Sequence, residues 1–344
     1  MQNTTYLNWV ISNTKTEWWH DSADPAELQL GLDRGAIGVT TNPFLGNIAV
    51  QKNRAIWAGE LAQVLGQNLP AEEKAEALMR IAVVKAAEKL IPQYESSAKR
   101  MGYVCAQVNP VRAGDRPAMM AMARRLNKWA PNISVKLPCT LAGLDVLEDC
   151  IAEGIGVTST VSFTVPQALA IAERHRKGIA RAKANGIEPG KCFAVIMIGR
   201  LDDFLREVAL DNRAPVSEAD IRQSGLAATK RAYKIYKQKG YEAVLLVAAL
   251  RGPYHLTELA GAELVMSIAP GAQPWFVDQD HPREARIDRD VPADVIDRLR
   301  QMPEFVRAYE PDGMQSEEFV SFGATQRTLA QFCDVGWRLL ENIK

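Results

Sequence analysis

Short apolar runs alternate with longer amphipathic stretches along most of the chain. Runs of this length bounded by turn residues are typical of buried strands, and the stretches between them have the spacing of helices. Eight strands are predicted, at residues 17–22, 36–42, 103–108, 133–138, 157–162, 192–198, 243–249 and 263–268. Helices are predicted between them, among others at 117–129, 142–153, 166–184, 217–239 and 256–259.

Eight strands alternating with helices predict a closed (β/α)8 barrel, an α/β fold. An open doubly wound sheet is the competing architecture, but the first strand lacks the glycine-rich sequence of dinucleotide-binding sheets. Residues 273–291 are predicted to be a long loop, and residues 292–344 to be helical and to pack across the barrel. We therefore expect one domain over 1–344, with a barrel core at about 17–270 and extra helices at both ends.

Composition narrows the partners of such a fold. The 41 basic and 41 acidic residues give a formal net charge of zero, so general attraction to nucleic acid or an anionic membrane is not expected. Five scattered cysteines without a CxxC pair favour reduced thiols and a cytoplasmic location. No stretch approaches the roughly 20 apolar residues of a membrane span, and no secretory signal is expected at the N-terminus. The four histidines lack metal-ligand spacing, so no metal is expected.

Lys136 lies inside an apolar run, ISVKLP at 133–138, that reads as a buried strand. Burial disfavours the ammonium form of a lysine, and a neutral amine is a nucleophile toward carbonyl carbons. The alternative is a structural lysine that extends its ammonium group to water at the strand end. The other strand ends decide between these two interpretations.

In a barrel of this kind the active site lies at the carboxyl ends of the strands. Polar side chains collect there in seven of the eight predicted strands. The candidates are Asp21 on the first strand, Thr40 and Asn42 on the second, Gln107 on the third, Thr158 and Thr160 on the fifth, and Arg200 and Arg251 after the sixth and seventh. Together with Lys136 they predict one pocket that holds an amine, a carboxylate, amides, hydroxyls and two guanidinium groups.

These groups suit carbon–carbon bond chemistry through a Schiff base. The lysine would attack a ketone, and the resulting iminium would draw electrons from the adjacent carbon so that the next bond breaks. Asp21 is the candidate for taking the proton from the hydroxyl of the departing carbon. Gln107 and Thr160 could hold the water that imine formation and hydrolysis need. Arg200 and Arg251 supply forked donors for a phosphate or another oxyanion.

Structural roles are alternatives for several of these residues. Asp21 could cap the helix that starts near Pro25, although Asp24 is better placed to do so. Interior hydrogen bonding is an alternative role for Thr158, Thr160 and Gln107. Asn42, which precedes a proline, is also a good turn former.

Charged partners near the site give further expectations. Arg200 could pair with Asp202 or Asp203, and Arg251 with Glu258. His20 is expected to face away from Asp21, and His175, in a charged helix end, to be solvated.

Four segments of the chain resemble the transaldolase family: AIGVTTNPFLGN (36–47), ISVKLPCTLAGLDVLEDCIAEGIGVTSTVSFT (133–164), IGRLDDF (198–204) and LRGPYHLTELAGAELVMSIAP (250–270). The resemblance covers about residues 17–270. It implies a barrel with a Schiff-base lysine on the fourth strand, a mechanism similar to that of class I aldolases, and no metal or organic cofactor. It also implies transfer of a dihydroxyacetone-type three-carbon unit from a ketose phosphate to an aldehyde, as in the pentose phosphate pathway. A homo-oligomer stays open.

Residue roles follow from the same resemblance. Lys136 is similar to the imine-forming lysine of the family and Asp21 to its acid/base aspartate. Asn42 corresponds to an asparagine that hydrogen-bonds donor hydroxyls, and Thr160 to a threonine that helps position the water. The arginines that follow strands six and seven correspond to the pair that binds the substrate phosphate.

The chain also departs from the family pattern. Gln107 stands where transaldolases usually have glutamate, as in fructose-6-phosphate aldolases, and a glutamine orients water without taking its proton. Met197 replaces a tyrosine of these aldolases or a phenylalanine of transaldolases. Val195 and Thr158 replace a serine and an asparagine that bind the terminal hydroxyl of the donor, and Ala249 replaces a serine of the phosphate site. The donor is therefore expected to differ from fructose 6-phosphate or sedoheptulose 7-phosphate.

Three other functions stay open at this point. The chain could be an aldolase that releases the ketone unit, acting on a sugar phosphate or a sulfosugar. It could be an unrelated lysine aldolase for keto acids, because two arginines also suit a carboxylate. It could finally be a barrel that binds sugar phosphates without catalysis.

Overall fold

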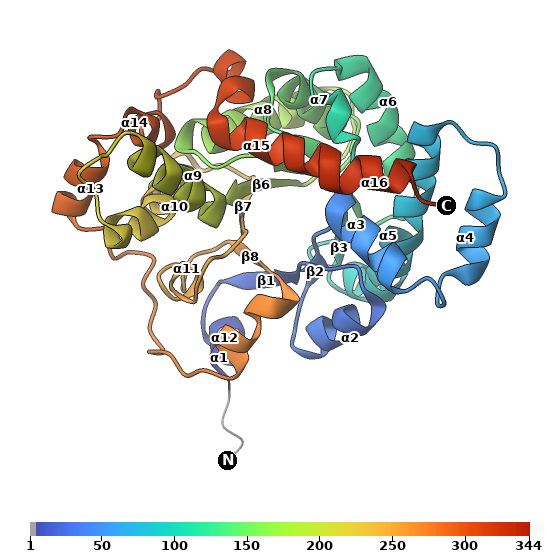
Figure 1. Ribbon diagram of the computed structural model, residues 1–344, viewed down its shortest axis with the longest axis horizontal. Coiled ribbons are helices and arrows are strands. Elements are labelled where there is room, and N and C mark those ends of the chain that lie inside the picture. Colours follow the sequence, from blue (N-terminus) through green and yellow to red (C-terminus); the bar gives the residue numbers. More distant parts are fainter. Residues whose placement is uncertain (1–4) are drawn as a thin grey trace.

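A closed barrel of eight parallel strands forms the centre of the computed structural model, which describes residues 5–344. The strands follow one another around the barrel in sequence order, and the eighth pairs with the first (Figure 1). Their bounds are β1 Glu17–His20, β2 Gly38–Val39, β3 Tyr103–Gln107, β4 Ile133–Pro138, β5 Val157–Thr160, β6 Cys192–Met197, β7 Val244–Ala248 and β8 Val265–Ile268. The predicted (β/α)8 barrel is confirmed.

Helices surround this barrel and fill most connections between strands. The predicted helices are all present, each within two residues of its expected bounds: α6 Arg116–Asn127, α7 Leu141–Ala152, α8 Val165–Ala184, α10 Glu218–Lys239 and α11 Tyr254–Thr257. The remaining connections contain α2 Pro25–Asp33, α3 Pro43–Lys52, α4 Ala58–Leu65, α5 Ala71–Ser96, the short 3-10 helix η1 Pro110–Arg112 and α9 Ile198–Asp211. Helix α1, Tyr6–Asn13, is the extra helix at the amino end.

The region after β8 is more helical than expected. Residues 273–291 were predicted to be a loop, but the 3-10 helix η2 (Pro270–Ala272) leads directly into α12 (Pro274–Val277). The tail contains α13 Ala293–Leu299, α14 Pro303–Tyr309, the 3-10 helix η3 Ser316–Ser321, α15 Gly323–Phe332, the π-helical turn η4 Cys333–Trp337 and α16 Arg338–Glu341. Figure 1 shows α15 and α16, in red, running across the barrel as predicted.

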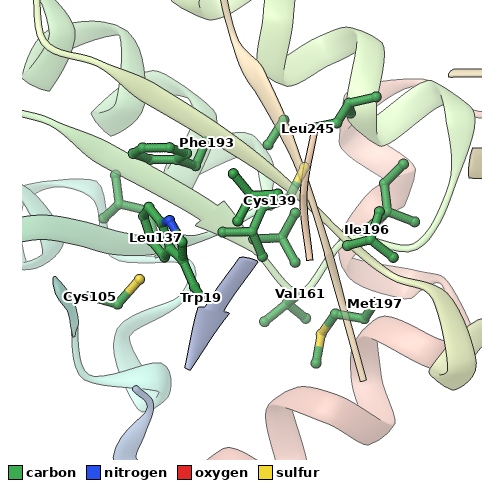
Figure 2. Close-up of a cluster of buried hydrophobic side chains, with 14 of the residues drawn as sticks. Trp19, Cys105, Leu137, Cys139, Val161, Phe193, Ile196, Met197 and Leu245 are labelled. Atoms are coloured by element: carbon green, nitrogen blue, oxygen red, sulfur yellow. The ribbon is translucent and has the colours of Figure 1, made fainter. Parts of the chain in front are cut away.

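An aromatic cluster fills the barrel interior on its amino-terminal side. Trp19 packs its ring edge-to-face on Phe193, with centroids 4.5 Å apart, and Tyr103 contacts the same phenylalanine at 5.4 Å. Gly38 makes room for the tryptophan, because a Cβ at this position would lie 2.5 Å from its ring. Figure 2 shows the tryptophan and phenylalanine within the surrounding apolar cluster. This packed layer separates the carboxyl ends of the strands from a depression at their amino ends, which is lined by residues such as Glu17, Lys191 and Glu263.

Of the predictions for His20 and His175, the first is confirmed by the structure and the second is wrong. His20 is fully buried and its Nδ1 lies 3.0 Å from Nε2 of Gln273, away from the polar end of β1, as expected. His175 was expected to be solvated but is buried, with Nε2 3.3 Å from the carbonyl oxygen of Gly190. The prediction was wrong because this residue sits on the inner face of α8, whereas its arginine neighbours point outward.

Candidate active site

A cavity of about 290 Å³ lies at the carboxyl ends of the strands. Seven of the nine predicted site residues line it: Asp21, Thr40, Asn42, Lys136, Thr160, Arg200 and Arg251. They come from strands β4 and β5 and from the segments that follow β1, β2, β6 and β7. The fold thus brings together groups that are up to 230 residues apart in the sequence (Asp21 to Arg251).

Lys136 supplies the amine of this cavity. Its side chain is only 6% exposed, and its Nζ donates a hydrogen bond to the carbonyl oxygen of Thr41 at 3.0 Å. The strand places it between Gln107 of β3 and Thr158 of β5 in register. Because β4 is buried along its whole length, the amine meets solvent only through the cavity.

Asp21 directly follows β1 and shares the cavity with the lysine. Its Oδ1 accepts a hydrogen bond from Oγ1 of Thr40 at 2.5 Å, and the same hydroxyl lies 2.5 Å from Oγ of Ser267 on β8. Burial raises the pKa of the Asp21 carboxyl, against the opposing effects of the Lys136 charge and the Thr40 hydrogen bond. A carboxyl group with a raised pKa beside an amine is a candidate for proton transfer.

Three predicted site residues have a buried polar atom without a hydrogen-bond partner. These atoms are Thr160 Oγ1, Gln107 Oε1 and Arg200 Nε, out of ten such atoms in the described part of the chain. Folded proteins leave few such atoms, and each one needs a reason. Left-handed backbone is also present nearby, at Val161 (φ 57°) beside the threonine and at Ala249 (φ 62°). Such strain in non-glycine residues collects at functional sites.

The mouth of the cavity contains the two guanidinium groups. Arg200, in the first turn of α9, extends toward α15: its Nη1 lies 3.4 Å from Thr328 Oγ1 and its Cζ 5.7 Å from the ring centroid of Phe332. Phe332 itself lines the cavity. The C-terminal helix therefore supplies part of the cavity wall, which local sequence patterns did not indicate.

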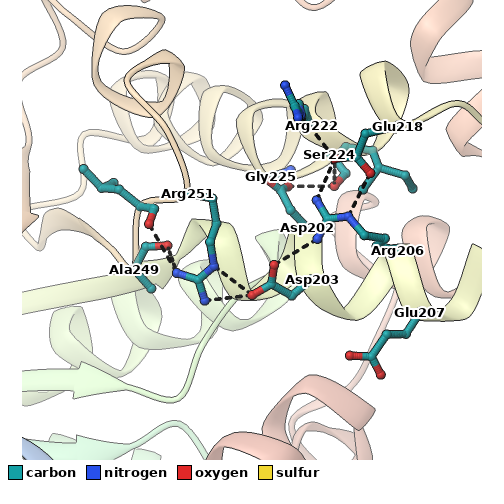
Figure 3. Close-up of polar contacts among 12 residues, drawn as sticks. Asp202, Asp203, Arg206, Glu207, Glu218, Arg222, Ser224, Gly225, Ala249 and Arg251 are labelled. Atoms are coloured by element: carbon teal, nitrogen blue, oxygen red, sulfur yellow. Dashed lines mark hydrogen bonds and ion pairs between the residues drawn. The ribbon is translucent and has the colours of Figure 1, made fainter. Parts of the chain in front are cut away.

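Arg251 is held by a carboxylate of the neighbouring element. Its Nε and Nη2 donate to Asp203 Oδ2 on α9 at 2.8 and 2.7 Å, and its Nη1 donates to the Ala249 carbonyl oxygen (Figure 3). Anion binding was the preferred prediction for both arginines, and surface ion pairs were the alternative. The alternative pairing of Arg251 with Glu258 is not present, because that carboxylate pairs with Arg286. Arg200 is not paired with an α9 aspartate either, since Asp203 binds Arg251 and Asp202 is bonded elsewhere.

Asp202 and His255 fix the relative position of the two arginine-bearing segments. Both side chains are fully buried, and His255 Nε2 lies 2.9 Å from Asp202 Oδ2. Because His255 Nδ1 accepts the backbone N–H of Arg251, the ring donates from Nε2 to the carboxylate. The other oxygen of Asp202 accepts from Ser224 Oγ and the Gly225 N–H on α10. The loop after β7 is thereby anchored to α9 and α10.

Gly199 allows this close approach and yields a testable prediction. A Cβ at this position would lie 2.3 Å from the carbonyl oxygen of Ala249 and 2.5 Å from Cγ of Arg251. Gly199→Ala should therefore displace Arg251 and weaken binding of an anionic donor about tenfold or more, as expected when a hydrogen bond to a charged group is lost. Gly59→Ala, on a helix with open space around the new methyl group, is the matched control. Donor affinity measured by calorimetry checks this, and unchanged affinity in Gly199→Ala would contradict it.

Two predicted site residues do not reach the cavity, and others were missed. Thr158 lies one layer deeper, with its hydroxyl 2.7 Å from Ser134 Oγ and 3.4 Å from Cys105 Sγ. Gln107 is buried beside Lys136 on β3 without lining the cavity. Ser267 was missed, although it is the one hydroxyl in the apolar run LVMSI and so carried a signal.

Two features are absent from the described residues: a group of side chains that could hold a metal ion and a helix that could cross a membrane. Within residues 5–344 no three or more His, Cys, Asp and Glu side chains gather closely enough to hold a metal ion. Across the same part of the chain no helix combines the length and apolar character that crossing a membrane requires.

The fold and the site define the chain as a (β/α)8 barrel with a buried lysine–aspartate site at the carboxyl end of its strands. A family profile described as Transaldolase/Fructose-6-phosphate aldolase matches residues 18–320. The chain belongs to this family.

Individual relatives agree with this assignment. The chain is 30% identical over 241 residues to a transaldolase of Neisseria gonorrhoeae, an alignment that covers 67% of this chain and 66% of the relative. It is 29% identical over 261 residues to a transaldolase of Thiobacillus denitrificans, covering 74% and 66%, and 28% identical over 215 residues to transaldolase 1 of Streptomyces avermitilis, covering 61% and 56%. The chain thus spans 56% to 66% of the length of these relatives, less than two thirds.

Proposed function

We propose that the protein is a transaldolase that moves a three-carbon ketone unit from a ketose phosphate to an aldehyde through an imine on Lys136. The observation that carries this proposal is the pairing of a buried amine with a carboxyl of raised pKa in one cavity. Family membership and relatives named transaldolase support it as well.

The first half of the proposed reaction forms the imine and breaks a carbon–carbon bond. Nζ of Lys136 adds to the donor ketone, and the adduct loses water to give an iminium. Asp21 takes the proton from the hydroxyl on the second carbon from the iminium carbon. As that hydroxyl becomes a carbonyl, the bond beside it breaks, its electron pair moves into an enamine on Lys136, and an aldehyde leaves.

The second half decides between transfer and release. In transfer, the enamine carbon attacks an acceptor aldehyde, Asp21 returns its proton to the new alkoxide, and water hydrolyses the iminium. In release, the enamine takes a proton and one water hydrolyses the imine to free ketone and amine. Thr160, whose buried hydroxyl lacks a partner, is proposed to hold this water. Gln107, which lies beside Lys136 on β3 and whose Oε1 also lacks a partner, is proposed to help orient it.

Substrate binding is proposed for the rest of the cavity. Asn42 and Thr40 line the cavity, and their polar side chains suit hydroxyl groups of the donor. Arg200 and Arg251 at the mouth suit its phosphate. Asn42 also caps α3 through the Leu45 N–H at 2.9 Å, so its position is fixed before substrate arrives. Thr158, which is bonded to other side chains below the cavity, is left with a structural role.

Borohydride reduction tests the proposed imine. We expect incubation with ketose phosphates or dihydroxyacetone, followed by reduction, to add the ketone mass to the intact chain and to map it to Lys136. An adduct on another lysine, or none with any ketone, would overturn the imine. Turnover that requires an added aldehyde identifies a transferase, whereas turnover without one identifies an aldolase.

A further inference from the structure

The wall of the cavity is divided into a polar and an apolar part. Strands β6 and β7 supply only apolar lining: Val195, Met197, Leu246 and Ala248. These residues pair across the two strands in register, Val195 with Leu246 and Met197 with Ala248, and so form one continuous patch. The polar lining comes from β8, β1, β2, β4 and β5, and from Arg200 and Arg251, which follow β6 and β7 beyond the apolar residues of these strands.

The apolar patch continues downward into the packed interior. Side chains two residues apart share a face of a strand, which places Phe193, Val195 and Met197 of β6 in one line toward the barrel axis. Phe193 belongs to the aromatic cluster below the cavity, and Figure 2 shows it together with Met197. Val195 is only 2% exposed, so a substrate atom that reaches it leaves water. A hydroxyl placed against this patch would lose its hydrogen bonds to water and find none in return.

The ketone bound to Lys136 has two carbon substituents, and they face different walls. The substituent that is cleaved carries the hydroxyl that Asp21 deprotonates, so it lies toward the polar side with Thr40 and Ser267. We infer that the second substituent lies against the apolar lining of β6 and β7 and carries no hydroxyl, and that the natural donor is a 1-deoxyketose phosphate whose ketone unit is hydroxyacetone. The inference rests on the proposed function and narrows its substrate class.

The atoms of this reaction balance without a further reactant. The imine forms between Nζ of Lys136 and C2 of the donor with loss of one water. The C3–C4 bond then breaks: its electron pair enters the enamine at C3, the proton of the C4 hydroxyl goes to Asp21, and a phosphorylated aldehyde leaves. In transfer, the three-carbon unit made up of C1, C2 and C3 moves to an acceptor aldehyde. Release adds a proton at C3 and one water at C2, and yields hydroxyacetone.

A competition experiment measures the preference directly. The protein is mixed with equal concentrations of hydroxyacetone and dihydroxyacetone and reduced with borohydride, and the two adducts on Lys136, which differ by one oxygen atom, are quantified by mass spectrometry. N-acetyl-lysine amide in a parallel reaction corrects for intrinsic ketone reactivity. We expect a corrected preference for hydroxyacetone of about 10- to 100-fold, the range in which apolar pockets reject an added hydroxyl.

Matched variants test the residues responsible. Val195→Thr keeps the shape of the side chain and adds a hydroxyl, and it should reduce the preference about tenfold. Val247→Thr makes the same change on β7 at a buried residue that does not line the cavity, and it should leave the preference unchanged.

The outcomes separate this inference from the proposed function. A wild-type protein that traps both ketones equally, or favours dihydroxyacetone, overturns the inference and leaves the imine mechanism standing. An unchanged preference in folded Val195→Thr also overturns it. Absence of any Lys136 adduct with either ketone overturns the proposed function, and the inference with it.

Discussion

Replacement of Lys136 by methionine is expected to reduce turnover of a ketose phosphate donor by about 10⁴-fold or more, the scale on which loss of an essential nucleophile acts. Among the described residues no other side chain lining the cavity carries an amine, so the covalent route disappears with the lysine. Methionine matches the length of the lost side chain and adapts to irregular space. Because the variant also loses the hydrogen bond from Nζ to the Thr41 carbonyl oxygen, its thermal unfolding is measured to confirm that it is folded.

Lys191 offers a matched control for this variant. Its Nζ also donates to a backbone carbonyl oxygen, that of Arg100 at 2.9 Å, and it is also partly buried, but it lies just before β6 at the opposite end of the barrel. Lys191→Met should keep turnover within about twofold of the wild type. Steady-state kinetics with thermal unfolding of both variants measures this. Turnover retained in Lys136→Met, or lost equally in both variants, would contradict the assignment of the nucleophile.

The strands could be predicted because their sequences carry the signal locally. ISVKLP gives β4 with the bounds that the structure has, since a buried apolar run meets a proline at its end. The second strand was predicted too long, at 36–42. It ends at Val39 because Asn42 turns away from the sheet to cap α3 through the Leu45 N–H. Whether residues 1–344 form one domain stays a prediction.

Depth in the barrel could not be predicted from strand periodicity. Period two correctly puts Thr158 and Thr160 on the same face of β5. It does not say which of the two reaches the cavity and which is bonded beneath it. Thr160 lines the cavity and Thr158 bonds to Ser134 instead, because the stagger of β4 against β5 sets the level of each residue.

Contacts between residues of distant elements also could not be predicted from the sequence. For Arg251 the local sequence offered a glutamate seven residues away as the alternative to anion binding, whereas β6 and β7 lie side by side and bring Asp203 to the arginine. Phe332 had no local signal at all, because its place at the cavity depends on how the C-terminal helices cross the barrel. Contacts of this kind follow from the closed fold and not from any stretch of sequence.

Replacement of Asp21 by asparagine should reduce turnover about 10²- to 10⁴-fold, the usual contribution of a positioned acid or base. Imine formation does not need this carboxylate in the proposed scheme. Borohydride should therefore still trap a simple ketone on Lys136 in the variant, while bond cleavage is lost. A variant that loses trapping and turnover together would assign Asp21 to imine formation instead.

The pH dependence of Asp21 separates a base from a merely structural carboxylate. As a base it acts when ionised, and burial raises its pKa above 3.8, so kcat/KM should fall as pH drops through that raised pKa and this limb should vanish in Asp21→Asn.

The contribution of Asp21 to stability has the opposite pH dependence. Because its pKa is higher in the folded than in the unfolded state, the carboxyl stabilises the fold below the unfolded pKa, and this contribution is lost as pH rises through the folded pKa. At neutral pH Asp21→Asn should therefore be at least as stable as the wild type. Asp24→Asn is the control: burial raises the pKa of Asp24, but bonds from Asn53, Lys52 and backbone N–H groups outweigh it and lower the pKa. That variant should lose stability above pH 4 and keep its turnover, because a lowered pKa stabilises the fold above the unfolded value.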